Sequence, residues 1–375
     1  MEYQPSSYTL SSASSSHSNP SHHRLITTLN GHTSAISSLT LAGKFLYTGS
    51  SDREIRSWNR SPYETEISNN LVLAGNGAVK CLIIHSNKLF TAHQDHKIRV
   101  WKITDSNNNL EQQQRQQQKY THVATLPTLG DRAAKALIPR NHVEIRRHKK
   151  RTWVHHVDAV SALALSKDGA FLYSVSWDRT IKIWRTKDFA CLESINAAHD
   201  DAINAVAVAY DGRVYTGSAD KKIKVWKRPE GEKKHLLVDT LEKHDSGVNA
   251  LALSCDENVL FSGACDRCVL VWERGERGMG LMGKLCGHKK SILCLAVAAD
   301  LVCSGSADKT IRVWRGFNGE YCCLAVLEGH RASVKCLTAV VDHCSNPSHS
   351  QASFLVYSGG LDCDIKVWQI LVPAS

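Results

Sequence analysis

The chain has 375 residues, of which 42% are hydrophobic and 22% charged, and its formal net charge is +10. This length and composition allow a large buried core, and no apolar run approaches the ~18 residues of a membrane-spanning helix, which excludes that class. The thirteen cysteines, together with an N-terminal segment that does not resemble a secretory signal, predict reduced thiols in the cytosol or nucleus.

Residues 1–23 are rich in serine and are expected to form a disordered tail. Beyond it, one phrase recurs seven times: a strand, a tight turn with aspartate, and a second strand that ends in tryptophan. The aspartate stands six residues before the tryptophan in every copy. The copies are YTGSSDREIRSW (47–58), FTAHQDHKIRVW (90–101), YSVSWDRTIKIW (173–184), YTGSADKKIKVW (215–226), FSGACDRCVLVW (261–272), CSGSADKTIRVW (303–314) and YSGGLDCDIKVW (357–368).

The tryptophans lie 42 to 46 residues apart except across two gaps, and this period is typical of four-stranded propeller blades. The phrase, with a histidine 20 to 22 residues before the aspartate in most copies, resembles the WD40 family. The sequence departs from the family name, because no repeat tryptophan is followed by aspartate.

The resemblance implies a chain of hydrogen bonds from tryptophan to a hydroxyl, a histidine and an aspartate, which keeps buried polar groups paired. These tetrads are His32, Thr48, Asp52, Trp58; His156, Ser174, Asp178, Trp184; His199, Thr216, Asp220, Trp226; His244, Ser262, Asp266, Trp272; His288, Ser304, Asp308, Trp314; and His330, Ser358, Asp362, Trp368. A hydrolase triad uses the same residue types, but six near-copies argue against catalysis. We therefore predict a protein that is not an enzyme and has no cofactor.

The second blade departs from the pattern, because Gly75 stands where the first blade has His32. We expect Asp95 to have lost its partner and this blade to be the loosest. The segment LITTLNG (25–31) resembles the last strand of other blades, such as LLVDTLEK (236–243). The N-terminal strand is therefore expected to close the last blade, and the predicted fold is an all-β, seven-bladed WD40 propeller over residues 24–375.

The gap between blades 2 and 3 predicts an insertion at 102–151, which has eleven Lys or Arg against four acids and thus most of the net charge. If HVATL (122–126) is the outer strand of blade 2, the basic run lies in a loop on the face that bears Trp177. If IRRHKKRTWV (145–154) is that strand, the run lies at the rim. The basic residues predict a nuclear-import signal or an acidic-partner patch: Arg146, Arg147, Lys149, Lys150 and Arg151.

Trp177 precedes the turn aspartate of blade 3, on the face where the histidine loops and aspartate turns must meet. An aromatic side chain there suits partner binding, although it can also lie flat against a neighbouring blade. The loops of this face have opposite charge in neighbouring sectors, which favours a protein partner over nucleic acid. The predicted partner-binding residues are Trp177, Arg179, Lys289, Lys290, Arg331, Asp201 and Asp245.

Two sets of residues have the types that bind metals. Cys265 and Cys268 have the CxxC spacing, but they flank the structural Asp266 and no second pair stands nearby. His343, Cys344 and His349 lie in a smaller insertion of blade 7, residues 342–352. We predict no metal site at either place.

The serine-rich head, the seven blades, the blade without its histidine, and the stretch THVATLPTLGD…HVEIRRHKKRTWVHHVDAVSALALS also resemble the plant WD-repeat group named for JINGUBANG. That resemblance implies a regulatory adaptor that contacts transcriptional regulators in plant development, in pollen germination and tube growth. We further expect a monomer that occurs in nucleus and cytoplasm. The alternatives are a substrate receptor of a cullin ubiquitin ligase, whose Trp-Asp-x-Arg signature is missing, and nucleic-acid binding through the basic insertion.

Overall fold

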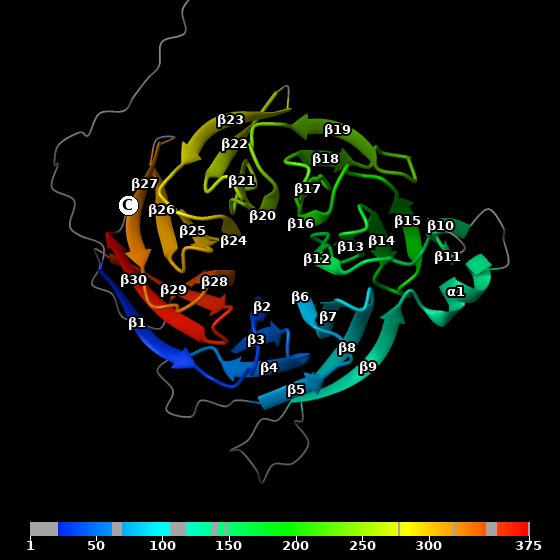
Figure 1. Ribbon diagram of the computed structural model, residues 1–375, viewed down its shortest axis with the longest axis horizontal. Helices are drawn as coiled ribbons and strands as arrows, with labels where there is room; N and C mark the ends of the chain where they lie inside the picture. The colour runs from blue at the N-terminus through cyan, green and yellow to red at the C-terminus, as the bar shows by residue number, and fades with distance from the viewer. Residues whose placement is uncertain are drawn as a thin grey trace, which may run out of the picture.

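Figure 1 shows the computed structural model, in which seven four-stranded antiparallel sheets surround a central opening. The structure describes residues 22–61, 70–105, 118–136, 142–146, 149–276, 278–317, 320–342 and 351–373. The predicted all-β, seven-bladed propeller is therefore confirmed. The predicted tail lies outside the described residues except for its last two, as do Arg147, His343, Cys344 and His349. In the described part, no helix is both long and apolar enough to cross a membrane.

The first four blades follow one another along the chain, each from its innermost to its outermost strand. Blade 1 contains β2 (Ile36–Ala42), β3 (Phe45–Ser50), β4 (Glu54–Asn59) and β5 (Asn70–Ala74). Blade 2 contains β6 (Val79–His85), β7 (Lys88–His93), β8 (Ile98–Asp105) and β9 (Gln118–Leu126). Blade 3 contains β12 (Val160–Leu165), β13 (Phe171–Ser176), β14 (Ile181–Arg185) and β15 (Cys191–Ile195). Blade 4 contains β16 (Ile203–Val208), β17 (Val214–Ser218), β18 (Ile223–Lys227) and β19 (Leu236–Leu241).

The last three blades complete the ring. Blade 5 contains β20 (Val248–Leu253), β21 (Val259–Ala264), β22 (Val269–Gly275) and β23 (Gly278–Leu285). Blade 6 contains β24 (Ile292–Ala298), β25 (Leu301–Ser306), β26 (Ile311–Phe317) and β27 (Glu320–Leu327). Blade 7 combines β28 (Val334–Val341), β29 (Gln351–Gly360) and β30 (Ile365–Pro373) with the N-terminal β1 (His22–Leu29).

The pairing of β1 with β30 closes the ring, as expected from the sequence. The two strands are antiparallel, with Leu25 opposite Trp368 and Leu29 opposite Ile365. The fourth strand of blade 7 therefore comes from the opposite end of the chain (Figure 1). Closure pairs the outer side of β30 within the sheet instead of leaving it as an open edge.

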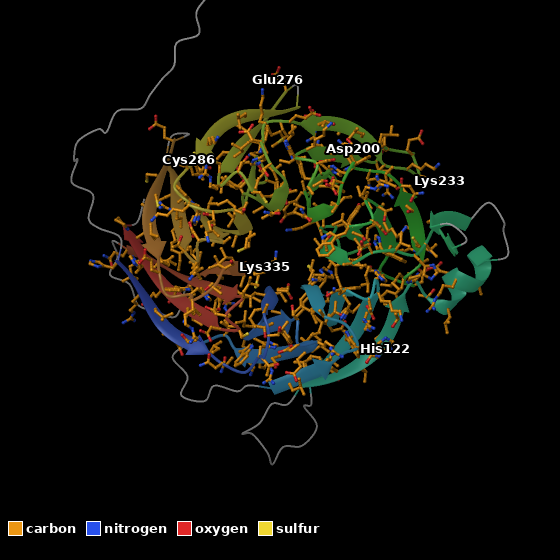
Figure 2. All side chains as sticks on the ribbon, in the orientation of Figure 1. His122, Asp200, Lys233, Glu276, Cys286 and Lys335 are labelled. Carbon is orange, nitrogen blue, oxygen red and sulfur yellow. The ribbon has the colours of Figure 1, made fainter. Side chains whose placement is uncertain are left out.

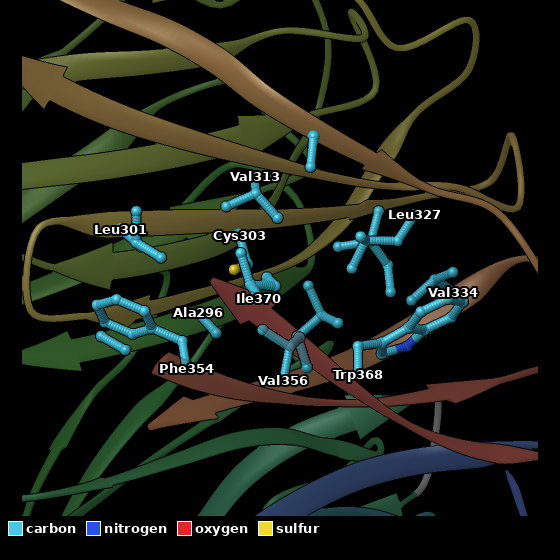
Figure 3. Packing of buried hydrophobic residues seen from close by; sticks show 14 of the residues in the cluster. Ala296, Leu301, Cys303, Val313, Leu327, Val334, Phe354, Val356, Trp368 and Ile370 are labelled. Atoms are coloured by element: carbon cyan, nitrogen blue, oxygen red, sulfur yellow. The ribbon is translucent and has the colours of Figure 1, made fainter. Parts of the chain in front are cut away.

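The core lies between neighbouring blades, which cover both faces of each sheet. The second strand of every blade is buried along most of its length, so its residues do not alternate between polar and apolar. The glycine of the repeated phrase permits this contact, because a Cβ on Gly217 would lie 2.7 Å from the Val248 side chain of the next blade. Figure 3 shows the packing between blades 6 and 7, where Trp368 lies beside Val334 and Leu327.

The long insertion between blades 2 and 3 has two separate parts. Because β9 pairs with β8, it is the outer strand of blade 2, and HVATL belongs to it. The second part contains α1 (Leu129–Ala136) and a hairpin of β10 (His142–Arg146) with β11 (Lys149–Thr152).

The hairpin position corrects the sequence-based placement of the basic run. With HVATL as the outer strand, the sequence placed this run in a loop on the face that bears Trp177, but α1 and the hairpin lie outside the ring, beside β15 (Figure 1). The Asp131 carboxylate of α1 accepts a hydrogen bond from the backbone N–H of Cys191, the first residue of β15, at 3.0 Å. This contact holds the start of the insertion against the outer edge of blade 3.

Candidate interaction face

One face of the ring is formed by the loops that enter the blades and by the aspartate turns between the second and third strands. We call it the histidine face, because side-chain hydrogen bonds from loop histidines join these two sets of segments. In blade 4, Trp226 Nε1 donates to Thr216 Oγ1 at 3.0 Å, and His199 Nε2 lies 2.8 Å from the same oxygen. His199 Nδ1 lies 2.8 Å from Asp220 Oδ2, which also accepts the Asp200 backbone N–H.

The same chain of contacts occurs in six blades. The histidine-to-aspartate distances run from 2.6 to 3.2 Å, and the histidine-to-hydroxyl distances from 2.7 to 2.9 Å. The tryptophan N–H can only donate, so the hydroxyl can in turn donate to histidine Nε2 and histidine Nδ1–H to aspartate. The neutral imidazole satisfies every member of this chain.

Burial and hydrogen bonding shift the pKa values of the tetrads. Burial lowers the histidine pKa, only partly offset by the aspartate, at His32, His156, His199, His288 and His330. Burial alone would raise the pKa of Asp308, but hydrogen bonds from Thr310, the Lys289 amide and His288 outweigh it and hold this pKa at about 2.

The tetrad hydroxyls are fully buried, and each already contacts a tryptophan and a histidine. A serine such as Ser304 is therefore inaccessible to a substrate, and a hydrolytic role for these triads has no geometric support. The tetrads stabilise the loops and turns that form the histidine face.

Blade 2 has its own version of the tetrad, which corrects the expectation that Asp95 is unpartnered. His93, in the second strand of the blade, takes the place of the loop histidine: its Nε2 lies 2.8 Å from Thr91 Oγ1 and its Nδ1 donates to the Gly77 carbonyl at 3.0 Å. Asp95 instead binds the guanidinium of Arg99 at 2.5 and 3.1 Å. We call this altered set of contacts in blade 2 the rewired tetrad. Both His93 and Asp95 have hydrogen-bond partners in it.

Replacing His93 by serine, the residue at this position in four other blades, is expected to lower the free energy of unfolding by about 1–3 kcal/mol. The substitution removes the buried partner of Thr91 and the link to the Gly77 carbonyl. Urea unfolding of the two proteins measures the difference. Gln94→Ala, in the exposed turn next to it, is the control and is expected to change stability by less than about 0.5 kcal/mol. Equal midpoints for wild type and His93→Ser would show that the rewired contacts do not stabilise the blade.

Trp177 lies on the histidine face and 42% of its surface is exposed. The ammonium of Lys80, on the innermost strand of blade 2, lies 5.2 Å from the centre of its ring, in a cation–π contact. The tryptophan thus touches the neighbouring blade and still presents a large aromatic surface to solvent.

Residues that follow the turn aspartates form a set of exposed cations. They adopt positive φ angles of 67 to 75°. None of these five forms an ion pair with the described residues: Arg53, Arg179, Lys221, Arg267 and Lys309.

The other predicted partner-binding residues are also exposed on this face, in two sectors. Asp201 and Asp245 lie on blades 4 and 5, where Lys222 bridges Glu242 at 3.0 Å and Asp200 at 4.0 Å. Lys289 and Lys290 lie on blade 6. Arg331 lies on blade 7, where it contacts Asp364 at 3.2 Å. These residues therefore lie on the consecutive blades 4 to 7.

The CxxC spacing of Cys265 and Cys268 does not indicate which thiols lie closest together. The sulfur of Cys268 lies 3.3 Å from that of Cys286, and burial together with this neighbour raises the pKa of Cys268 to about 11. Among the described residues, three potential ligand atoms converge only at His32, Asp52 and Glu54. His32 and Asp52 already bind each other within the first tetrad.

A family model described as WD domain, G-beta repeat, matches residues 23–59, 147–185, 190–227, 236–273, 280–315 and 321–369. These segments make up more than half of the chain, so the chain belongs to the WD40 family. The unmatched stretch between residues 59 and 147 contains blade 2, the blade with the rewired tetrad.

Curated relatives share the repeat over limited lengths. An uncharacterized WD repeat-containing protein of Schizosaccharomyces pombe is 39% identical over 88 residues, 23% of each chain. U3 small nucleolar RNA-associated protein 13 of Saccharomyces cerevisiae is 26% identical over 154 residues, 36% of this chain and 18% of that protein. Ribosome biogenesis protein YTM1 of Coccidioides immitis is 23% identical over 252 residues, 65% of this chain and 51% of that protein. The chain spans 18% to 51% of the length of these relatives.

Proposed function

We propose that the chain is a non-catalytic protein-interaction scaffold whose partner binds the histidine face. The observation that supports this most directly is the exposed Trp177, which contacts Lys80 and lies in the same turn as the exposed Arg179. Large aromatic side chains and arginines are the residues that dominate binding energy at protein interfaces. The buried tetrads beneath this face fix its loops, so little ordering is needed when a partner binds.

The finer form of the proposal is a monomeric regulatory adaptor in plant development that contacts transcriptional regulators and occurs in nucleus and cytoplasm. The developmental role and the contact with transcriptional regulators rest on the resemblance to the JINGUBANG group. The basic residues of the β10–β11 hairpin support nuclear import, because this hairpin lies outside the ring (Figure 1).

A second candidate is a subunit of a ribosome-biogenesis assembly. It is favoured by the similarity to ribosome biogenesis protein YTM1, which aligns with 65% of this chain. The cullin-receptor alternative lacks its signature, since the residues that follow the seven blade tryptophans are Asn59, Lys102, Arg185, Lys227, Glu273, Arg315 and Gln369.

Trp177→Ala is expected to remove most partners from the proximity-labelling profile of the full chain, because it removes the aromatic anchor without disturbing the core. Leu192→Ala is the matched control: Leu192 is 41% exposed on the outer strand of the same blade. A third variant neutralises Arg146, Lys149, Lys150 and Arg151 and is expected to lower the nuclear fraction of the protein.

The identity of the lost partners separates the two candidates, since transcriptional regulators support the first and ribosome-assembly factors the second. An unchanged profile for Trp177→Ala would refute the assignment of the histidine face.

A further inference from the structure

Two cysteines of blade 5 face each other across neighbouring strands. The sulfur of Cys268, which precedes β22, lies 3.3 Å from that of Cys286, which follows β23. Val269 pairs with Leu285 in this antiparallel ladder, so the two cysteines form the next opposed pair. Opposed residues of antiparallel strands have Cα atoms about 4.5–5.5 Å apart, within the range of about 4.4–6.8 Å that a disulfide spans. A disulfide therefore fits here without a change of strand register.

The equivalent position has a different role in other blades. In blade 4 the opposed residues form an ion pair, with Lys222 Nζ 3.0 Å from Glu242 Oε1. In blade 3 the residue at the position of Cys268 is Thr180, whose hydroxyl donates to the tetrad aspartate at 2.6 Å. The Cys268 side chain instead contacts the sulfur of Cys286. Support of the tetrad therefore does not explain this thiol.

The two thiols differ in their access to solvent. Cys286, labelled in Figure 2, is exposed, whereas Cys268 is 8% exposed. Burial, together with the neighbouring Cys286, raises the pKa of Cys268 to about 11, so this thiol stays protonated at neutral pH. The exposed Lys284 stands two residues before Cys286, on the same side of the strand, and a cation beside a cysteine favours its reactive thiolate. An oxidant therefore reaches Cys286 first, and Cys268 is placed to react second.

We propose that Cys268 and Cys286 are an oxidative modification site, where a hydroperoxide converts the thiol pair into a disulfide. The Cys286 thiolate attacks one peroxide oxygen: an S–O bond forms, the O–O bond breaks, and water or an alcohol leaves. The Cys268 sulfur then attacks the sulfenic sulfur: the S–S bond forms, the S–O bond breaks, and the departing hydroxide takes the Cys268 proton as water. The two sulfurs lose two electrons, which the peroxide gains. A dithiol reverses the reaction by thiol–disulfide exchange.

The disulfide would join two segments that form the histidine face. Cys268 follows the tetrad aspartate Asp266 of blade 5 by two residues, and Cys286 precedes the tetrad histidine His288 of blade 6 by two. The link closes a loop that contains the whole β22–β23 hairpin and holds the outermost strand of blade 5 covalently to its neighbour. The proposal goes beyond the scaffold function, because it depends on no partner.

Peptide mapping of the full chain tests the proposal. The reduced protein is treated with hydrogen peroxide, its remaining thiols are alkylated in denaturant, and it is digested with trypsin without reductant. Cleavage after lysine and arginine releases the two cysteines on separate peptides, 268–274 and 285–289, each with one cysteine. The alkylated forms of both peptides are expected to be lost in equal amounts, and a disulfide-linked pair of the two is expected to appear. Dithiothreitol is expected to restore both alkylated peptides.

Three variants assign the roles of the thiols. Cys286→Ser is expected to leave peptide 268–274 fully alkylated after peroxide, because its buried thiol has lost its partner. Cys268→Ser is expected to accumulate a sulfenic acid on Cys286, which dimedone traps. Cys265→Ser is the matched control, since Cys265 is an exposed thiol in the same turn, and the yield of linked peptide is expected to stay at the wild-type level.

Complete alkylation of both peptides in the peroxide-treated wild-type chain would overturn the proposal. Pairing of Cys286 with any other cysteine would overturn it as well, and so would loss of the link in Cys265→Ser. A yield that rises with protein concentration would also refute it, because such a dependence indicates a link between two chains. The wild-type mapping decides the question even if a serine variant folds poorly.

Discussion

Trp368→Ala is expected to lower the free energy of unfolding by about 3–5 kcal/mol, a large fraction of the total stability of a typical domain. Trp368 is 2% exposed and packs in the cluster between blades 6 and 7 (Figure 3). Its ring N–H donates to Ser358 Oγ at 2.8 Å, so the substitution also removes a partner from a buried tetrad. Because Trp368 lies opposite Leu25 of β1, the cavity opens in the blade that closes the ring.

Trp177→Ala is the control for this prediction, because it removes the same side chain from an exposed turn. It removes the contact with Lys80. We expect this variant to lower the free energy of unfolding by less than about 0.5 kcal/mol. Urea unfolding followed by tryptophan fluorescence and circular dichroism measures both variants. Similar losses for the two would show that Trp177 is part of the core, and would remove the basis for using it as a binding-site probe.

Acidification below about pH 6.5 is expected to destabilise the propeller steadily. The folded-state pKa values of five tetrad histidines and of His93 lie below the ordinary value of 6.5, so the unfolded chain binds more protons. A depressed pKa contributes stability above the unfolded-state value, and this contribution is lost as the pH falls towards the folded-state value. For His93, whose pKa burial lowers to about 4, the contribution is about 3 kcal/mol at neutral pH.

Urea unfolding at several pH values between about 7.5 and 4.5 tests this expectation. His93→Gln is expected to be less stable at neutral pH and to lose less stability on acidification, since one buried titrating group is missing. His122→Gln, on the exposed outer strand of the same blade (Figure 2), is the control and should keep the wild-type slope. A free energy of unfolding that stays constant from neutral pH to about pH 5 would contradict the neutral, buried state of the tetrad histidines.

These predictions separate stability from recognition. The tetrads and the inter-blade core fix the loops, whereas Trp177 is 42% exposed and belongs to neither. A substitution at Trp177 therefore tests partner binding on an intact ring.

The sequence by itself determined the repeat number, the fold class and the six tetrads. Each is encoded within one blade, by a phrase in which Asp308 and Trp314, for example, keep a constant spacing. The strand that closes the ring was also predictable, because residues 25–31 have the pattern of an outer strand but precede the first blade. Local periodicity suffices for such features, since every blade packs against its neighbours in the same way.

Only the tertiary structure decided the features that depend on contacts between blades or on one altered blade. His93 replaces the missing histidine from a different strand, which the alignment of Gly75 with His32 could not reveal. The basic hairpin lies beside β15 because Asp131 binds the backbone of another blade. The contact of Lys80 with Trp177 was missed for the same reason: the two residues belong to blades 2 and 3, and only the packing of these blades brings them together.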